Sequence, residues 1–198
     1  MPETLRQVTP EDVLPDAEFA LQRKGRRAAL LPMKALRRVA LGPHCTFYFE
    51  SYETMLFQIQ EMLLIEKGGA AQLPDELAAY NPLIPKGREL VATVMFEVDD
   101  PVRRARLLGG LGGVEDNFRI MVGSDAVPGA SESDVERSRE DGKTSSVHFL
   151  RFGFSDAQVA AFRDPAVTVS VECDDSRYPH QTRLGGETRA ELARDFTD

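Results

Sequence analysis

The order of predicted elements between residues 90 and 174 limits the fold of this chain more than any other feature. Four strand-like runs of apolar residues occur there, and a helix-start signal follows the first and the third. The runs cover residues 90–98, 117–123, 145–154 and 166–173. The helix signals are Asp100-Pro101 and a capping box that begins at Ser155. This β-α-β-β-α-β order predicts an α+β protein with a ferredoxin-like antiparallel sheet.

The alternation of apolar and polar residues agrees with the strand positions of that fold. Its first and third strands are central, whereas its second and fourth strands are edges. The run from Leu90 to Val98 has apolar residues on both faces, as a central strand does. The run from Val167 to Cys173 alternates with polar residues. We therefore expect the last run to be an edge strand with one solvated face.

The 198 residues are expected to form a single domain with three parts. Residues 1–89 contain a basic segment, a hairpin and a long amphipathic helix, and form an N-terminal extension. Residues 90–174 form the ferredoxin-like core, and residues 175–198 form a C-terminal helix. From residue 19 to residue 49 there are seven basic residues and no acidic residue. Pro32 interrupts this segment, so that we expect short helical pieces there.

The most regular helical pattern runs from Tyr52 to Lys67 and has apolar residues on two faces. Phe57 and Leu64 lie apart from the main apolar stripe, so either the N-terminal segment or a second subunit should cover them. An uncovered face would leave an apolar patch in solvent. We therefore predict a homodimer or a complex with a protein partner, and the candidate partner surface is Phe57, Leu64, Arg26 and Arg27.

The segment Gly142-Lys143-Thr144-Ser145 is similar to the end of a nucleotide-binding P-loop, but its context differs. The full motif needs a glycine where Arg137 stands, a strand before the loop and a helix after it. Here a strand follows, so the helix N-terminus that would hold phosphate is missing. A turn is the better interpretation, because Asp141-Gly142 is a strong turn dipeptide. Lys143, Thr144 and Ser145 are retained as candidate anion ligands at the start of the third strand.

The three histidines are the candidates for a metal site. His148 alternates with apolar residues in the third strand, His44 lies at a turn, and His180 follows the last strand. No CxxC, HExxH or Glu-x-x-His pattern occurs, so a site would need residues distant in sequence, such as His148, His180 and Glu61. Iron or zinc is the candidate metal. The other interpretation of His148 is a hydrogen-bonded core residue.

Charge and composition bear on location and on other classes of partner. The net charge of −8 and the lack of an RNA-recognition signature argue against nucleic acid. The N-terminal residues lack the pattern of a secretory signal, and no apolar run has the length of a membrane span. We therefore expect a cytoplasmic protein with no membrane partner. Cys45 and Cys173 are then reduced thiols that serve as packing residues.

Four segments in order, RRVALGPH, FQIQEML, YNPLIP and DGKTSSVHFLRF, resemble a bacterial family known as domain of unknown function 3501. The resemblance covers residues 9–195. That family has no established activity, so the resemblance leaves open whether the protein is an enzyme. It implies only the cellular process to which the protein belongs. Its members are often encoded beside a rubrerythrin-like protein and an iron–sulfur oxidoreductase related to heterodisulfide reductases. We therefore expect an accessory or binding protein that serves such a redox system. The alternative is a small metal-dependent redox protein or metalloenzyme with His148 at its site.

Overall fold

A computed structural model describes residues 3–131 and 144–197 of the chain. Within these residues it has one eight-stranded antiparallel sheet and six α-helices. The strands are β1 (Arg38–Leu41), β2 (Cys45–Phe49), β3 (Glu89–Phe96), β4 (Phe118–Val122), β5 (Asp125–Ser131), β6 (Val147–Gly153), β7 (Val169–Cys173) and β8 (His180–Arg183). The helices are α1 (Asp16–Leu36), α2 (Tyr52–Glu66), α3 (Leu73–Tyr80), α4 (Pro101–Gly109), α5 (Asp156–Arg163) and α6 (Gly186–Leu192). No helix in these residues is both long and apolar enough to cross a membrane.

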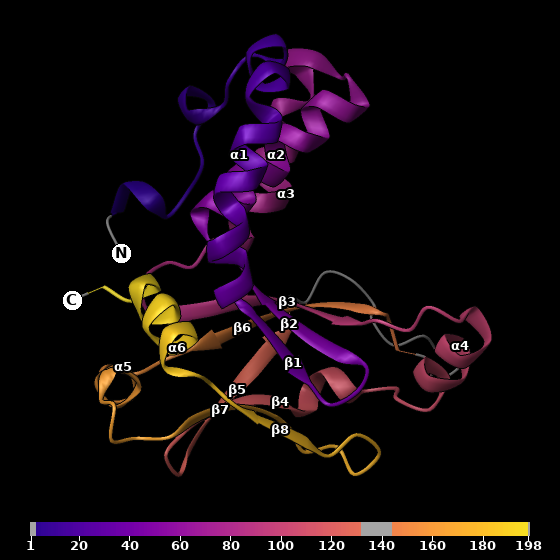
Figure 1. Cartoon of the computed structure of the whole chain (residues 1–198), viewed down its shortest axis with the longest axis vertical. Coiled ribbons are helices and arrows are strands. Elements are labelled where there is room, and N and C mark those ends of the chain that lie inside the picture. Colours follow the sequence, from indigo (N-terminus) through magenta and orange to yellow (C-terminus); the bar gives the residue numbers. More distant parts are fainter. Residues whose placement is uncertain (1–2, 132–143, 198) are drawn as a thin grey trace.

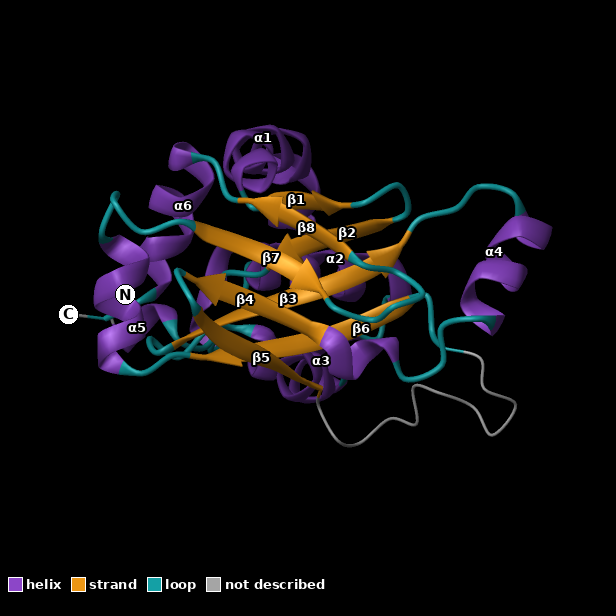
Figure 2. Ribbon diagram, turned by 90° about the horizontal axis from the view of Figure 1, so that it is seen from below, coloured by secondary structure: helices purple, strands orange, loops and turns teal. Residues whose placement is uncertain are grey.

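The sheet is nearly closed and barrel-like. Its strands follow the order β1-β2-β3-β6-β5-β4-β7-β8, and the two outermost strands lie side by side (Figure 2). The Thr182 hydroxyl of β8 donates a hydrogen bond of 2.7 Å to the carbonyl oxygen of Ala40 in β1. The Tyr178 hydroxyl donates to the carbonyl oxygen of Leu41 at 2.7 Å and accepts from the backbone N–H of Cys45 at 3.0 Å. These side-chain hydrogen bonds connect the two edges of the sheet, β1 and β8, which are not paired by backbone hydrogen bonds.

The fold is α+β, but the ferredoxin-like prediction is wrong. In that topology β4 would pair with β6, and β7 would pair with β3 as an edge strand. Instead β5 lies between β6 and β4, the β1–β2 hairpin pairs with β3, and β7 pairs with both β4 and β8. The predicted pair of β3 with β6 does form. The topology differs because two additional strands and the N-terminal hairpin belong to the same sheet.

The strand β5 has little sequence signal. It contains Pro128 and Gly129, both typical of turns, and of its residues only Val127 is buried. Gly129 is nevertheless needed there, because a Cβ atom at this position would lie 2.9 Å from the ring of Phe152 and 3.1 Å from the carbonyl oxygen of Phe118. Close packing of the backbone against an aromatic ring therefore explains a glycine inside a strand.

The interior of the sheet is a packed apolar core. The ring of Phe47 in β2 lies 5.5 Å from the ring of Phe118 in β4 and 6.2 Å from that of Phe152 in β6. Leu150 and Ile120 are also fully buried. Inward-facing residues from seven strands, β1 to β7, contribute to this core. The sheet therefore encloses side chains, as small closed sheets do.

Three helices form an arm that projects from one side of the sheet (Figure 1). We call α1, α2 and α3 the helical arm. It has its own apolar cluster, in which Met55, Ile59 and Leu63 of α2 pack with Val91 of β3. Ser51 caps α2, since its side chain accepts a hydrogen bond from the N–H of Thr54. This helix confirms the most regular helical pattern of the sequence.

Helix α1 runs unbroken over 21 residues, so the expectation of short helical pieces is wrong. Pro15 precedes the first helical residue, where proline is tolerated. Pro32 lies in the last turns of the helix. It has no N–H, so the carbonyl oxygen of Ala28, four residues earlier, lacks its usual hydrogen bond. Both residues are exposed. Water can satisfy that carbonyl, so the helix continues past Pro32.

Candidate functional site

The predicted site at the start of β6 is a buried polar network. Thr144 donates to Glu115 through an Oγ1–Oε2 hydrogen bond of 3.1 Å. His148 Nε2 lies 2.9 Å from the carbonyl oxygen of Ser145 and 3.2 Å from Thr144 Oγ1. A carbonyl oxygen can only accept, so Nε2 carries the proton. Glu115, Thr144 and His148 are all buried, and Lys143 lies outside the described residues. The network holds the start of β6 against the chain around Glu115.

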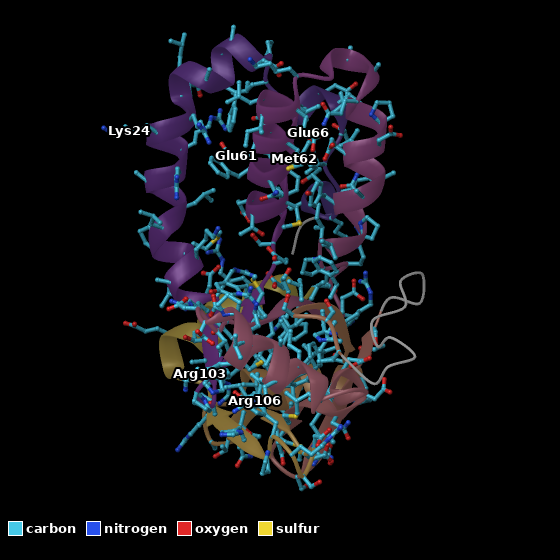
Figure 3. All side chains as sticks on the ribbon, turned by 90° about the vertical axis from the view of Figure 1, so that its right-hand side faces the viewer. Lys24, Glu61, Met62, Glu66, Arg103 and Arg106 are labelled. Carbon is cyan, nitrogen blue, oxygen red and sulfur yellow. The ribbon has the colours of Figure 1, made fainter. Side chains whose placement is uncertain are left out.

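Two of the four predicted metal ligands, His44 and His180, both lie beside Tyr178, whose hydroxyl accepts a hydrogen bond of 3.1 Å from the backbone N–H of His44. His148 points into the sheet interior, His44 is in the β1–β2 turn, and His180 in β8 stacks on Tyr178 at 4.2 Å. Glu61 lies on α2 and forms two hydrogen bonds of 2.7 Å with Arg23 of α1. Figure 3 shows Glu61 in the helical arm, away from the sheet. In the part of the chain that the structure describes, no group of three or more His, Cys, Asp or Glu residues could hold a metal ion.

Both cysteines face the apolar core of the sheet. Burial raises the pKa of the Cys173 thiol to about 11. Burial raises the pKa of Cys45 still further above its ordinary value. A nucleophilic or metal-binding cysteine needs its thiolate, which is a minor species at neutral pH under these conditions. Cys45 and Cys173 therefore act as packing residues.

A buried ion cluster at the base of the arm has no sequence signal. The guanidinium of Arg37, directly after α1, donates to both carboxylate oxygens of Asp195 at 2.7 and 2.9 Å and to Glu191 at 3.1 Å. Burial opposes the charged form, yet the hydrogen bond and charge of Asp195 hold the pKa of Arg37 above its usual value. The partners are 154 and 158 residues away in sequence. This cluster fixes α1 to α6 and to the C-terminal residues that follow it.

The predicted partner surface lies on the helical arm. Phe57 of α2 packs edge-on against Phe19 of α1, with ring centroids 5.6 Å apart. Phe57, Leu30 and Arg26 line a groove of about 230 Å³ between these helices. Leu64 is half-buried, and Arg27 is exposed. The N-terminal segment therefore covers Phe57, which was one of the two alternatives for this face of the helix.

The outer side of α1 is largely exposed to solvent. Of its 21 residues, all of which the structure describes, only Phe19 is buried. Leu21 is 88% exposed and Leu31 is 59% exposed. Lys24 and Arg27 are exposed on the same helix. The arm thus presents apolar and cationic side chains together, which is a chemistry suited to binding a protein surface.

These observations define a class: an α+β protein in which a filled, nearly closed sheet carries a helical arm whose first helix, α1, is cationic. The family model described as "Protein of unknown function (DUF3501)" matches residues 7–196. The chain belongs to this family, which confirms the resemblance of its four segments. A crystal structure from Burkholderia pseudomallei, described as a novel protein of unknown function, has a TM-score of 0.88 and 34% identity, covering 96% of this chain and 100% of that chain. A comparison with curated proteins gives no match.

Proposed function

We propose that the chain is a non-catalytic accessory protein that binds a partner protein through its helical arm. The observation that carries this proposal is the packing of α1, in which one residue of 21 is buried. Most helical stability in proteins comes from burial of an apolar face, and α1 obtains little of it from its own chain. A partner that covers the outer side of α1 would supply the missing burial and remove Leu21 and Leu31 from water.

The residue types that usually perform chemistry already have structural roles. Glu61 is paired with Arg23, Thr144 is bonded to Glu115, and both cysteines have raised pKa values. His148 is completely buried in the sheet interior. A catalytic group needs access to its substrate, and these side chains have little. Binding through an exposed surface therefore agrees better with the geometry than catalysis at His148 does.

The family resemblance adds a setting to this proposal. Genes of such proteins often lie beside those for a rubrerythrin-like protein and an iron–sulfur oxidoreductase, so we propose a partner from such a redox system. The alternative assembly is a homodimer formed through the same arm. Both assemblies would use the outer side of α1, where Arg27 is exposed, because α1 already covers Phe57.

Co-expression tests the proposal. The chain would be produced with a rubrerythrin-like protein, or with an iron–sulfur oxidoreductase, of its own organism, and each mixture would be analysed by size-exclusion chromatography with light scattering. The proposal predicts a stable complex with one of them. A chain that elutes alone from both mixtures contradicts it. Elemental analysis of the purified chain addresses the metalloenzyme alternative, which predicts stoichiometric iron or zinc that is lost in His148→Ala.

A further inference from the structure

The outer side of α1 carries a stripe of exposed residues at the spacing of a helix–helix seam. Its members recur at intervals of four and three residues, as the core positions of a coiled coil do. They are Ala17, Leu21, Lys24, Ala28, Leu31 and Ala35, and all are exposed. At about 100° per residue, this stripe lies on the opposite side of α1 from Phe19, which packs on Phe57 of α2. We call these six residues the α1 seam. Leu21 and Leu31 are its large apolar members and stand in solvent.

Cationic side chains lie in the α1 seam and along one of its edges. Lys24 belongs to it and points away from α2 (Figure 3), and Arg27 and Lys34 lie along one of its edges at the spacing of the helix. Residues 19–49 carry seven positive charges and no negative charge. Three of the seven, Arg23, Arg37 and Arg38, pair with carboxylates away from the seam. Because the whole chain has a net charge of −8, its remaining residues carry −15. The seam would therefore attract a surface rich in carboxylates and repel a basic one.

We propose that the α1 seam binds an amphipathic α-helix of a partner protein, with leucine-like residues along its own seam and Asp or Glu on the flank that meets Arg27 and Lys34. This inference rests on the proposed accessory function and specifies the chemistry of the partner. Helix α1 is about 31 Å long at roughly 1.5 Å per residue, so a partner helix of about 20 residues matches it. Docking of an apolar helical face between charged flanks is a common mode of protein recognition.

Charge favours this occupant over a second copy of α1. An antiparallel two-fold pairing that brings Leu21 next to the partner copy's Leu31 would centre on the region between Lys24 and Arg27. Four cations from the two copies would then lie close together, and like charges repel. An acidic helix places carboxylates beside the same cations. Charge complementarity thus selects an acidic partner helix.

The test uses the full chain and a defined peptide probe. The probe is a fluorescent 21-residue helical peptide with leucines at the seam spacing and glutamates on one flank. A second peptide has the same leucines and lysines in place of the glutamates. Fluorescence anisotropy measures the binding of each peptide to the purified protein. The proposal predicts that the acidic peptide binds at least about tenfold more tightly than the basic one, and that added salt weakens this binding.

Two pairs of variants separate the apolar contribution from the charge contribution. Leu21→Ala with Leu31→Ala should weaken binding of the acidic peptide about tenfold, because it removes the two large seam residues. Lys24→Glu with Arg27→Glu should reverse the preference, so that the basic peptide binds more tightly. The matched controls are on α4. Val102→Ala is the control for the leucine variants, since Val102 is 67% exposed. Arg103→Glu with Arg106→Glu is the control for the charge variants (Figure 3). Neither control should change binding.

Each other outcome overturns the inference. Equal binding of the two peptides, or binding of neither, shows that the α1 seam does not select an acidic helix. Self-association that is lost in the Leu21→Ala, Leu31→Ala variant assigns the seam to a second copy, and seam-dependent binding to phosphatidylserine vesicles assigns it to a lipid surface. A complex with a redox partner that survives Lys24→Glu with Arg27→Glu leaves the accessory function standing and refutes this inference alone. Absence of any complex with either redox partner refutes the accessory function itself.

Discussion

The sheet and the helical arm bury their apolar residues to very different extents. In the sheet, Phe47 and Phe152 are completely buried and contact rings from other strands. In the arm, α1 buries Phe19 and leaves Leu21 and Leu31 in solvent. The free energy of folding therefore comes mainly from the sheet and from the inner side of the arm. The outer side of α1 contributes little to it and is available for binding.

The largest effect is expected in the sheet interior. Phe47→Ala should lower the free energy of unfolding by about 3–5 kcal/mol, because it leaves a cavity among packed rings. The matched change in the arm is Phe57→Ala, which should cost clearly less because Phe57 is only half-buried against Phe19. Urea unfolding measures both values. Equal losses would mean that the two regions contribute alike to stability.

The junction between the regions should be nearly as sensitive. Arg37→Ala leaves Asp195 and Glu191 buried without their cation and should cost about 3–5 kcal/mol in urea unfolding. The adjacent Arg38→Ala is the control, since Arg38 is exposed and its contact with Glu97 is 3.4 Å long. It should change stability by less than about 1 kcal/mol. A small effect of Arg37→Ala would show that the arm needs no ionic anchor.

A smaller and pH-dependent effect is expected at Asp175, in the β7–β8 connection. A hydrogen bond from the Arg177 side chain holds the pKa of Asp175 below its ordinary value of 3.8. Because this pKa is lower in the folded than in the unfolded state, the ionised carboxylate stabilises the folded protein at pH values above the unfolded-state pKa. This stabilisation is lost as the pH falls through the folded-state pKa. Asp175→Asn should therefore cost about 1 kcal/mol at pH 7. The difference from wild type in thermal unfolding should narrow below about pH 3.8; a constant difference down to pH 2 would refute the ion-pair explanation.

The smallest effect on stability is expected on the outer side of α1. Leu21→Ala and Leu31→Ala should each change the free energy of unfolding by less than about 0.5 kcal/mol, because both side chains are exposed. The contrast is Leu150→Ala in β6, a completely buried leucine whose loss should cost about 2–5 kcal/mol. If Leu21→Ala were as damaging as Leu150→Ala, α1 would be a structural element and its outer side would not be reserved for binding.

Much of the fold was predictable because local signals were strong. The strands β3, β4, β6 and β7 follow from apolar alternation, and α4 and α5 begin at the predicted caps. The topology was not predictable in the same way. β5 contains proline and glycine, and β8 is the polar segment His180–Arg183. The sheet closes through Thr182 and Tyr178, whose partners lie 133 to 142 residues away in sequence.

The candidate site, too, could be predicted only in part from the sequence. Phe57 was predicted as part of a partner surface from helical spacing and Arg26 from the run of basic residues, and the structure places both in the α1–α2 groove. The α1 seam was missed because Pro32 indicated a broken helix. With a continuous helix, the four-and-three spacing of Leu21 and Leu31 with the alanines would have been visible. The ion cluster at Arg37 had no local signal, since its acidic partners follow the last strand.

Hydrogen-exchange mass spectrometry of the chain, alone and in complex with its redox partner, would show which region of the chain the partner covers. We expect binding to slow amide exchange in peptides covering α1, Asp16–Leu36, while peptides from β3 and β6 in the sheet interior exchange as before. Slowed exchange confined to the start of β6, around Thr144 and His148, with α1 unchanged, would contradict the account and place the site at the buried polar network.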